Sequence, residues 1–214
     1  MKKEQGGVRA LLLEVTGAFE AQKEYLSGLD AQVGDGDHGF SMARGCGAGR
    51  RAVEDLPEDS APGEYLKAYG RALTCEVGGA MGPLFGLIFT QLGAAVRASG
   101  RLDTATAAKG MEDALGNITE LGGAREGDKT MVDAIAPAVR SLADSAEKGL
   151  PLAQALADSA RAARGGLEAT EAMAARRGRA KYLREKSVGH RDAGAASFCL
   201  LMDTMRRWAE EEGQ

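Results

Sequence analysis

Residues 29–39 read Leu-Asp-Ala-Gln-Val-Gly-Asp-Gly-Asp-His-Gly, an acidic, glycine-rich stretch between two helical patterns. This acidic loop places Asp30, Asp35 and Asp37 within eight residues, where their carboxylates repel one another unless a cation lies between them. The glycines interrupt helical structure and allow the chain to turn sharply. We therefore expect the acidic loop to bind a hard divalent metal ion; an acidic turn without a ligand is the alternative.

Two common motifs resemble the acidic loop only superficially. Residues 34–39 match G-x-G-x-x-G, but the dinucleotide fingerprint follows a strand and presents uncharged backbone to a pyrophosphate. Here a helical pattern precedes the loop, and the positions between the glycines are acidic. Counted from Asp35 as an EF-hand, the twelfth position is Cys46 instead of the required Glu. The sequence thus favours neither a Rossmann site nor a calcium sensor.

The composition is that of an ordinary globular protein. A chain of 214 residues with 44% hydrophobic residues fits a single domain, 1–214, with its own core. Its net charge is −4 and its basic residues are scattered, which disfavours nucleic-acid and membrane binding. Cys46, Cys75 and Cys199 lack metal-ligand spacing and are expected to be buried thiols. Without an apolar targeting or membrane-spanning segment, we expect a cytoplasmic protein.

Helical periodicity dominates the rest of the chain, and no convincing strand pattern occurs. Alanine is abundant and only five prolines are present. The spacing of apolar residues predicts eight helices, over about 8–28, 38–54, 63–77, 83–98, 103–121, 130–148, 151–176 and 193–211. Because the connections are short, we expect an all-α fold, an eight-helix antiparallel up-and-down bundle or barrel.

Three further connections are polar and rich in glycine: 78–83, 122–131 and 178–194. In an up-and-down arrangement the loops after the first, third, fifth and seventh helices lie at one end, so these three would meet the acidic loop there. Each also has an ordinary explanation. Segment 78–83 can be a tight helix connection, Thr130 and Asp133 can form a capping box, and Asp192 can be an N-cap. His190 can be a solvated loop residue, and the basic residues from Arg179 onward an exposed face.

Helix N-termini and carboxylates at one site predict a particular ligand. Free N–H groups at a helix N-terminus bind phosphate, while Mg²⁺ takes one or two carboxylates together with substrate phosphates. Three aspartates beside such helix ends therefore favour a magnesium-nucleotide complex, with Arg179 available to balance phosphate charge.

These motifs together resemble the nucleotide-binding L subunit of dihydroxyacetone kinase. The resemblance rests on Asp30 and on residues 34–39, 78–80, 82–86, 127–131, 178–180 and 187–190. It implies an antiparallel eight-helix barrel with the nucleotide at one end and two Mg²⁺ ions held by Asp30, Asp35 and Asp37. It also implies an ADP/ATP site made by His38, Gly39, Phe40, Ser41, Gly79, Ala80, Met81, Gly122, Met131, Arg179, Asp192, Ala193 and Gly194.

The resemblance further implies a reaction shared between proteins. The phosphoryl group passes from the nucleotide to dihydroxyacetone held on a separate K subunit, with no covalent nucleophile on this chain. A separate chain of this length resembles the phosphotransferase-system form, in which a phosphohistidine protein recharges bound ADP. The alternatives are a kinase module for another short ketose or other acceptor, and a non-catalytic nucleotide-binding regulator. Three positions depart from the family pattern. Ser41 stands where the family usually has Asn, Met81 where it has a small hydroxyl residue, and Ala193 where it has Pro.

Overall fold

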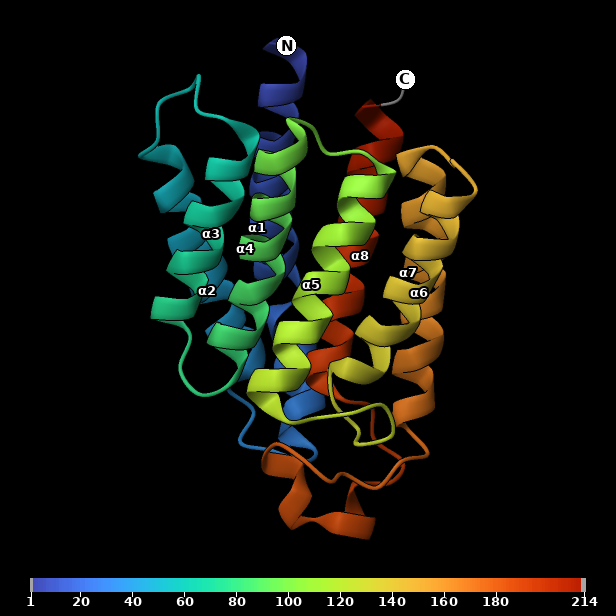
Figure 1. Ribbon diagram of the computed structural model, residues 1–214. Coiled ribbons are helices and arrows are strands. Elements are labelled where there is room, and N and C mark those ends of the chain that lie inside the picture. Colours follow the sequence, from blue (N-terminus) through green and yellow to red (C-terminus); the bar gives the residue numbers. More distant parts are fainter. Residues whose placement is uncertain (1, 213–214) are drawn as a thin grey trace.

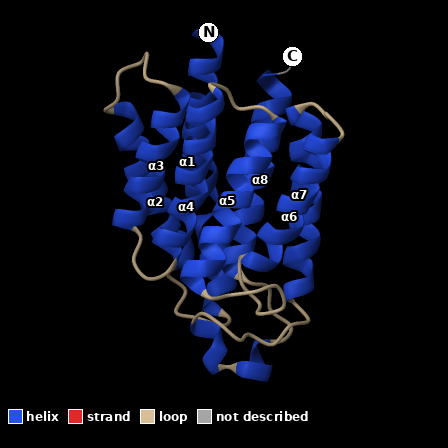
Figure 2. Cartoon of the chain, in the orientation of Figure 1, coloured by secondary structure: helices blue, strands red, loops and turns tan. Residues whose placement is uncertain are grey.

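Eight long helices make up most of the computed structural model, which describes residues 2–212, with side chains described from residue 7 onward (Figure 1). They are α1 (Lys2–Ala31), α2 (His38–Glu54), α3 (Pro62–Glu76), α4 (Met81–Ser99), α5 (Thr104–Gly122), α6 (Val132–Glu147), α7 (Leu152–Thr170) and α8 (Ala193–Glu212). Two short 3₁₀ helices, η1 (Arg179–Tyr182) and η2 (Arg184–Ser187), lie between α7 and α8. Residues 2–212 contain no strand (Figure 2). The all-α prediction is confirmed.

The helices form a closed antiparallel ring. Each helix packs against the next along the chain, and α8 packs against α1 to complete the barrel. Successive helices run in opposite directions, so both ends of the described chain lie at one end of the barrel (Figure 1). The acidic loop and the three glycine-rich connections lie at the other end, as expected for an up-and-down eight-helix barrel.

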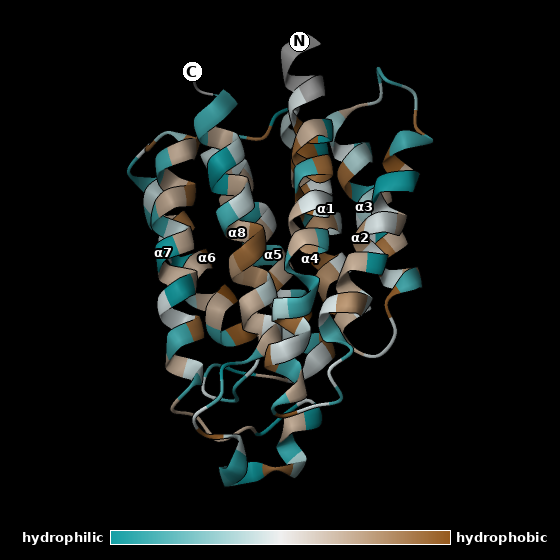
Figure 3. Cartoon of the chain, turned by 180° about the vertical axis from the view of Figure 1, so that it is seen from behind, coloured by the Kyte–Doolittle hydropathy of each residue, from teal (hydrophilic) through white to brown (hydrophobic). Residues whose placement is uncertain are grey.

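Apolar side chains on the facing sides of the helices fill the interior. In α1, the predicted core positions Val8, Leu12, Val15 and Phe19 are at most 3% exposed. The Phe19 ring meets Phe85 of α4 edge to face, with the centroids 5.9 Å apart. Brown, hydrophobic residues concentrate along the helices in Figure 3. No helix within residues 2–212 combines the length and apolar character needed to cross a bilayer.

Glycines allow α3 and α4 to approach especially closely. A Cβ atom on Gly70 would lie 2.6 Å from the carbonyl oxygen of Gly86, and one on Gly63 would lie 2.7 Å from that of Gly93. Both contacts involve backbone, which cannot move aside as a side chain can. The two helices that flank the 78–80 connection are therefore rigidly paired.

Three expectations from the sequence were wrong in detail. The first helix continues through Gly28 to Ala31, because Leu26 and Ser27 remain buried against the barrel and the turn comes only at Gly34 and Gly36. The seventh helix ends at Thr170 instead of near 176, and the structured turns η1 and η2 follow. Cys75 is exposed, whereas Cys46 and Cys199 are buried; all three are free thiols.

Candidate functional site

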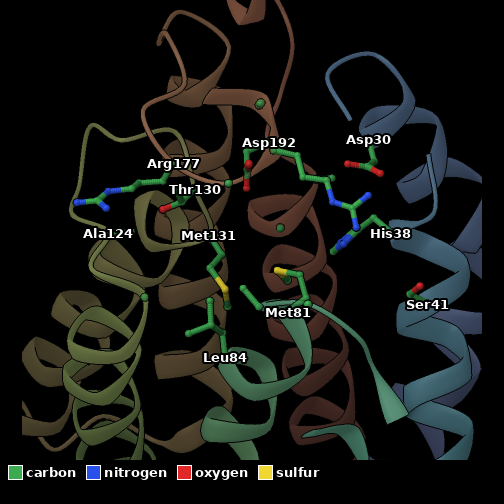
Figure 4. Close-up of a pocket in the computed structure, with 18 of the residues that line it drawn as sticks. Asp30, His38, Ser41, Met81, Leu84, Ala124, Thr130, Met131, Arg177 and Asp192 are labelled. Atoms are coloured by element: carbon green, nitrogen blue, oxygen red, sulfur yellow. The ribbon is translucent and has the colours of Figure 1, made fainter. Parts of the chain in front are cut away.

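The four loops at one end of the barrel surround a single cavity of about 390 Å³. Its walls come from the α1–α2, α3–α4, α5–α6 and α7–α8 connections and from the first turns of the helices that follow them. Figure 4 shows side chains from all these segments converging on it. The four loops therefore meet at one site, as the alternating helix directions predicted.

The acidic loop gathers its three carboxylates at the cavity edge. One oxygen from each of Asp30, Asp35 and Asp37 lies within 4.8 Å of the others. Asp30 sits in the last turn of α1, where Oδ2 accepts a hydrogen bond from Gly36 N at 2.8 Å. A Cβ atom on Gly34 would lie 2.4 Å from Asp30 Oδ1, so only glycine fits there without displacing this carboxylate. The loop therefore has the oxygen donors and the spacing that a hard divalent cation requires.

A basic side chain from the opposite wall reaches this cluster. Arg179, in η1, forms an ion pair with Asp35. Both side chains remain substantially exposed, so the pair contributes little to folding. Its importance is its position, because it places a guanidinium beside the carboxylates, where an anionic ligand held by a cation would lie.

The N-terminus of α2 is partly occupied by the protein itself. Ser27 Oγ accepts hydrogen bonds from Gly39 N at 3.0 Å and from Phe40 N at 3.3 Å. A Cβ atom on Gly39 would lie 1.9 Å from the carbonyl oxygen of Lys23, which shows how closely α2 crosses α1. Gly39 and Phe40 consequently do not line the cavity, and the Phe40 ring is 51% exposed.

His38 and Ser41, on the same helix, do line the cavity. His38 Nε2 lies 2.7 Å from Ser197 Oγ of α8, which fixes the ring orientation. Burial lowers the pKa of His38 below its ordinary value, more strongly than the charge of Asp30 raises it. Burial therefore favours the neutral imidazole, and Ser197 orients it for a hydrogen-bonding contact.

The inner part of the cavity is apolar. The side chains of Met81 and Met131 point toward one another above Leu84 (Figure 4), and Ile118 and Val132 extend the same surface. A Cβ atom on Gly194 would lie 3.4 Å from Met131 Cβ and 3.6 Å from Met81 Cε, so α8 closes against this floor. Met81 thus contributes hydrophobic contact where the family pattern has a hydroxyl. The cavity joins a charged rim to an apolar floor.

Two capping expectations are confirmed. Asp133 Oδ2 accepts from Thr130 N at 2.7 Å, and Thr130 Oγ1 accepts from Val132 N at 3.2 Å, so these residues cap α6. Asp192 Oδ2 accepts from Ala195 N at 2.7 Å at the start of α8. Burial at the cavity raises the pKa of Asp192 to about 6, against the lowering effect of the Ala195 hydrogen bond.

Lys129 was not predicted to contribute to the site. Its side chain is buried, with only 2% of the residue exposed, and Nζ donates to the carbonyl oxygen of Thr170 at 2.6 Å and to that of His190. It therefore joins the α5–α6 connection to both ends of the α7–α8 connection. Lys129 lies in segment 127–131 of the family resemblance, but nothing in the local sequence separates a buried lysine from an exposed one at this position.

The structure brings together most of the residues expected at the site, and their binding roles stay predictions. Those lining the cavity are Asp30, Asp35, Asp37, His38, Ser41, Gly79, Ala80, Met81, Gly122, Met131, Arg179, Asp192, Ala193 and Gly194. Lining residues that the sequence did not indicate include Arg44, Leu84, Ala124, Lys129 and Arg177. Arg177 Nε lies 3.9 Å from Asp128 and adds positive charge near the outer rim.

Comparison with known proteins gives a consistent set of relatives. Residues 32–207 match the DAK2 domain model. The chain is 40% identical over 195 residues to the ADP-binding subunit DhaL of the PEP-dependent dihydroxyacetone kinase of Escherichia coli, covering 90% of this chain and 91% of that subunit. It is 38% identical over 189 residues to the D-erythrulose kinase of Mycolicibacterium smegmatis, of which it spans only 33%.

Solved structures agree with these sequence matches. The dihydroxyacetone kinase of C. freundii in complex with AMP-PNP and Mg²⁺ superimposes with a TM-score of 0.70 at 25% identity, covering 94% of this chain and 33% of that one. Its native form gives a TM-score of 0.71 at 26% identity, covering 94% of this chain and 34% of that one. The shared part is therefore one barrel within a longer kinase.

Proposed function

Because this chain belongs to the DAK2 domain family, we propose that it forms a single domain, 1–214, which is the ADP/ATP-binding subunit of a dihydroxyacetone kinase. It is a phosphotransferase subunit that gives a phosphoryl group to dihydroxyacetone on a partner protein. The observation that carries this proposal is the cavity itself, which places three carboxylates and a guanidinium at the rim of an apolar floor. A nucleotide has the matching chemistry, with a flat base at one end and phosphates at the other.

In this proposal Asp30, Asp35 and Asp37 would hold two Mg²⁺ ions. Their oxygens are close enough to share cations, and Asp30 is fixed in place by Gly36 N. When bound, the ions neutralise phosphate charge and align the phosphates for transfer. This neutralisation explains how an acidic loop can face an anionic ligand.

The remaining side chains position the nucleotide. Met81, Leu84 and Met131 exclude water from the base, whereas Arg179 pairs with the charge at the rim. His38, held by Ser197, can contact a phosphate oxygen but need not carry the phosphoryl group. Phosphoryl transfer depends mainly on positioning and electrostatic stabilisation, so no covalent nucleophile is required on this chain.

Two partner proteins complete the proposal. A K subunit holds dihydroxyacetone, and a phosphohistidine-carrying phosphodonor of the phosphotransferase system recharges bound ADP. The support is that the E. coli relative of matching length is named as an ADP-binding subunit of a PEP-dependent kinase. The cytoplasmic location expected from the sequence stays a prediction.

A four-carbon ketose is the second candidate acceptor. Relatives at 34–38% identity include D-erythrulose and L-erythrulose kinases, although this chain spans only about a third of each. Acceptor choice belongs to the partner that binds the sugar, so both ketoses are substrates to test with that partner.

Titration calorimetry with Mg-ADP tests the nucleotide proposal. We expect the wild-type chain to bind, and Asp35→Asn combined with Asp37→Asn to abolish Mg-dependent binding. Asp59→Asn is the matched control, because Asp59 is exposed in the α2–α3 connection at the opposite end of the barrel. Unchanged affinity in the double variant would refute the metal assignment. Phosphorylation of dihydroxyacetone or erythrulose in the presence of K subunit and phosphodonor then separates a kinase subunit from a regulator.

A further inference from the structure

The connection between α7 and α8 is a long loop whose two ends lie close together. We call residues 171–192 the strap; it contains η1 and η2 and projects beyond the barrel (Figure 1). Its two ends meet at a neck, where Gly189 N donates to Glu171 O at 2.7 Å and Asp192 N donates to Thr170 Oγ1 at 3.0 Å. The strap therefore leaves and rejoins the barrel at nearly one point.

A buried lysine from a different loop closes this neck. Lys129 Nζ donates to Thr170 O, just before the strap begins, and to His190 O, near its end. One ammonium thus holds both sides of the neck at once. Burial lowers the pKa of Lys129, and the negative charges of Asp192, Glu171 and Asp133 counter this effect only in part. Such a buried cation is costly to place unless its hydrogen bonds are satisfied.

The backbone at Lys129 provides an independent observation. Its φ is +59°, a left-handed conformation that residues other than glycine adopt rarely. Nearby hydrogen bonds hold this conformation, because Asp133 Oδ1 accepts from Gly127 N at 2.5 Å and Oδ2 accepts from Thr130 N. Because the surrounding hydrogen bonds maintain this strained backbone, we infer that the direction of the Lys129 side chain is important for its contacts at the neck.

Three charged side chains of the strap line the cavity: Arg177, Arg179 and Asp192. Arg179 reaches Asp35 across the cavity from η1, and Asp192 caps α8 at the end of the strap. Besides the neck, polar contacts of the strap with the rest of the chain include Arg176 N to Asp128 O at 3.1 Å, Arg177 Nε to Asp128 at 3.9 Å, and His190 Nδ1 to Gln32 Oε1 at 2.8 Å. The direction of Arg179 therefore depends on how firmly the neck is closed.

We propose that Lys129 is a positioning residue that clamps the neck of the strap and so holds Arg179 and Asp192 in the geometry that binds the nucleotide. The identity of the ligand in this inference rests on the proposed function, whereas the holding of the strap by Lys129 does not. Lys129 acts through the strap, and two of its three ammonium donors are already used by backbone carbonyls.

Lys129→Met tests the proposal, with Lys109→Met as the matched control. Lys109 is an exposed lysine of α5, paired with Asp113. Without any ligand, we expect trypsin to cleave the Lys129→Met variant at the strap residues Arg179, Lys181, Arg184 and Lys186 about 10-fold faster, while the rest of the barrel resists. With ligands, we expect Mg-ADP affinity by calorimetry to fall about 10-fold or more, as is typical when a supporting residue is removed. Affinity for Mn²⁺ alone, measured by electron paramagnetic resonance, should not fall, because the three carboxylates come from the last turn of α1 and the α1–α2 connection, and release of Arg179 only removes a cation that competes for Asp35.

The outcomes distinguish the alternatives. Equal strap cleavage in wild type and Lys129→Met overturns the clamp, and reduced Mg-ADP affinity with unchanged cleavage indicates a direct ligand contact instead. If the strap is cleaved faster in Lys129→Met but the wild-type chain does not bind Mg-ADP, Lys129 holds the strap as proposed and the proposed function is rejected. If Lys129→Met does not fold, Lys129→Gln, which keeps a donor, is measured in the same way. Failure of both variants to fold overturns the proposal in favour of a purely structural lysine.

Discussion

Gly39→Ala is expected to destabilise the barrel by acting on a backbone contact. The added Cβ would lie 1.9 Å from Lys23 O, whereas ordinary contacts begin at 3.4 Å, so α1 and α2 must separate by roughly 1.5 Å (3.4 − 1.9). Overpacking of this kind costs up to about 3 kcal/mol, and the helix propensity of alanine returns about 1 kcal/mol. The net loss is about 2 kcal/mol, or a decrease in Tm of about 4–8 °C for a chain of this size.

Gly47→Ala on the same helix is the matched control for this prediction. Its Cβ would meet nothing closer than Arg51 Nη1 at 3.8 Å, so the substitution should stabilise α2 by about 1 kcal/mol. Thermal unfolding followed by circular dichroism measures both variants. The reasoning would be refuted if Gly39→Ala melted at or above the wild-type temperature, because the close crossing of α1 and α2 would then impose no constraint on residue 39.

Two further predictions concern charged groups of the cavity. The pKa of Asp192 in the folded protein is raised above the ordinary 3.8 to about 6, so the folded state binds the proton more tightly and wild-type stability should fall as pH rises between those values. Asp192→Asn retains an N-cap and should lose this pH dependence in urea titrations; an unchanged slope would contradict it. Arg179→Gln should weaken Mg-ADP binding in calorimetry while altering the unfolding free energy by no more than about 0.5 kcal/mol, because the side chain is 60% exposed. Arg161→Gln, at an exposed pair with Asp158, is its control and should leave both unchanged.

Features that depend on local patterning were predictable from the sequence. Apolar spacing fixed the number of helices, and short connections made their directions alternate, so the four polar loops had to share one end. The capping roles of Asp133 and Asp192 also followed from local chemistry. Side-chain oxygen atoms near helix starts are recognisable because they bond to backbone only a few residues away.

Features that depend on distant contacts were not predictable. Gly39 and Phe40 were expected at the site from the family resemblance, yet Ser27 of another helix accepts hydrogen bonds from their N–H groups. The end of α7 at Thr170 coincides with contacts from Lys129 and Asp192, which come from other segments. Gly28 looked like a helix terminus because glycine is frequent there, but packing of Leu26 and Ser27 carries α1 onward.

The connection between the closely packed helices α3 and α4 forms a cavity wall that has open space beside it. At Gly78 and Gly79 an added Cβ would meet nothing within 4 Å, although φ at Gly79 is +68° and favours glycine. Gly78 is therefore a position where a larger side chain can narrow the cavity while the Gly70–Gly86 contact keeps both supporting helices in place. Ligand preference can thus diverge at this wall without a corresponding loss of fold stability, which makes residue 78 a suitable first position for redesigning the pocket.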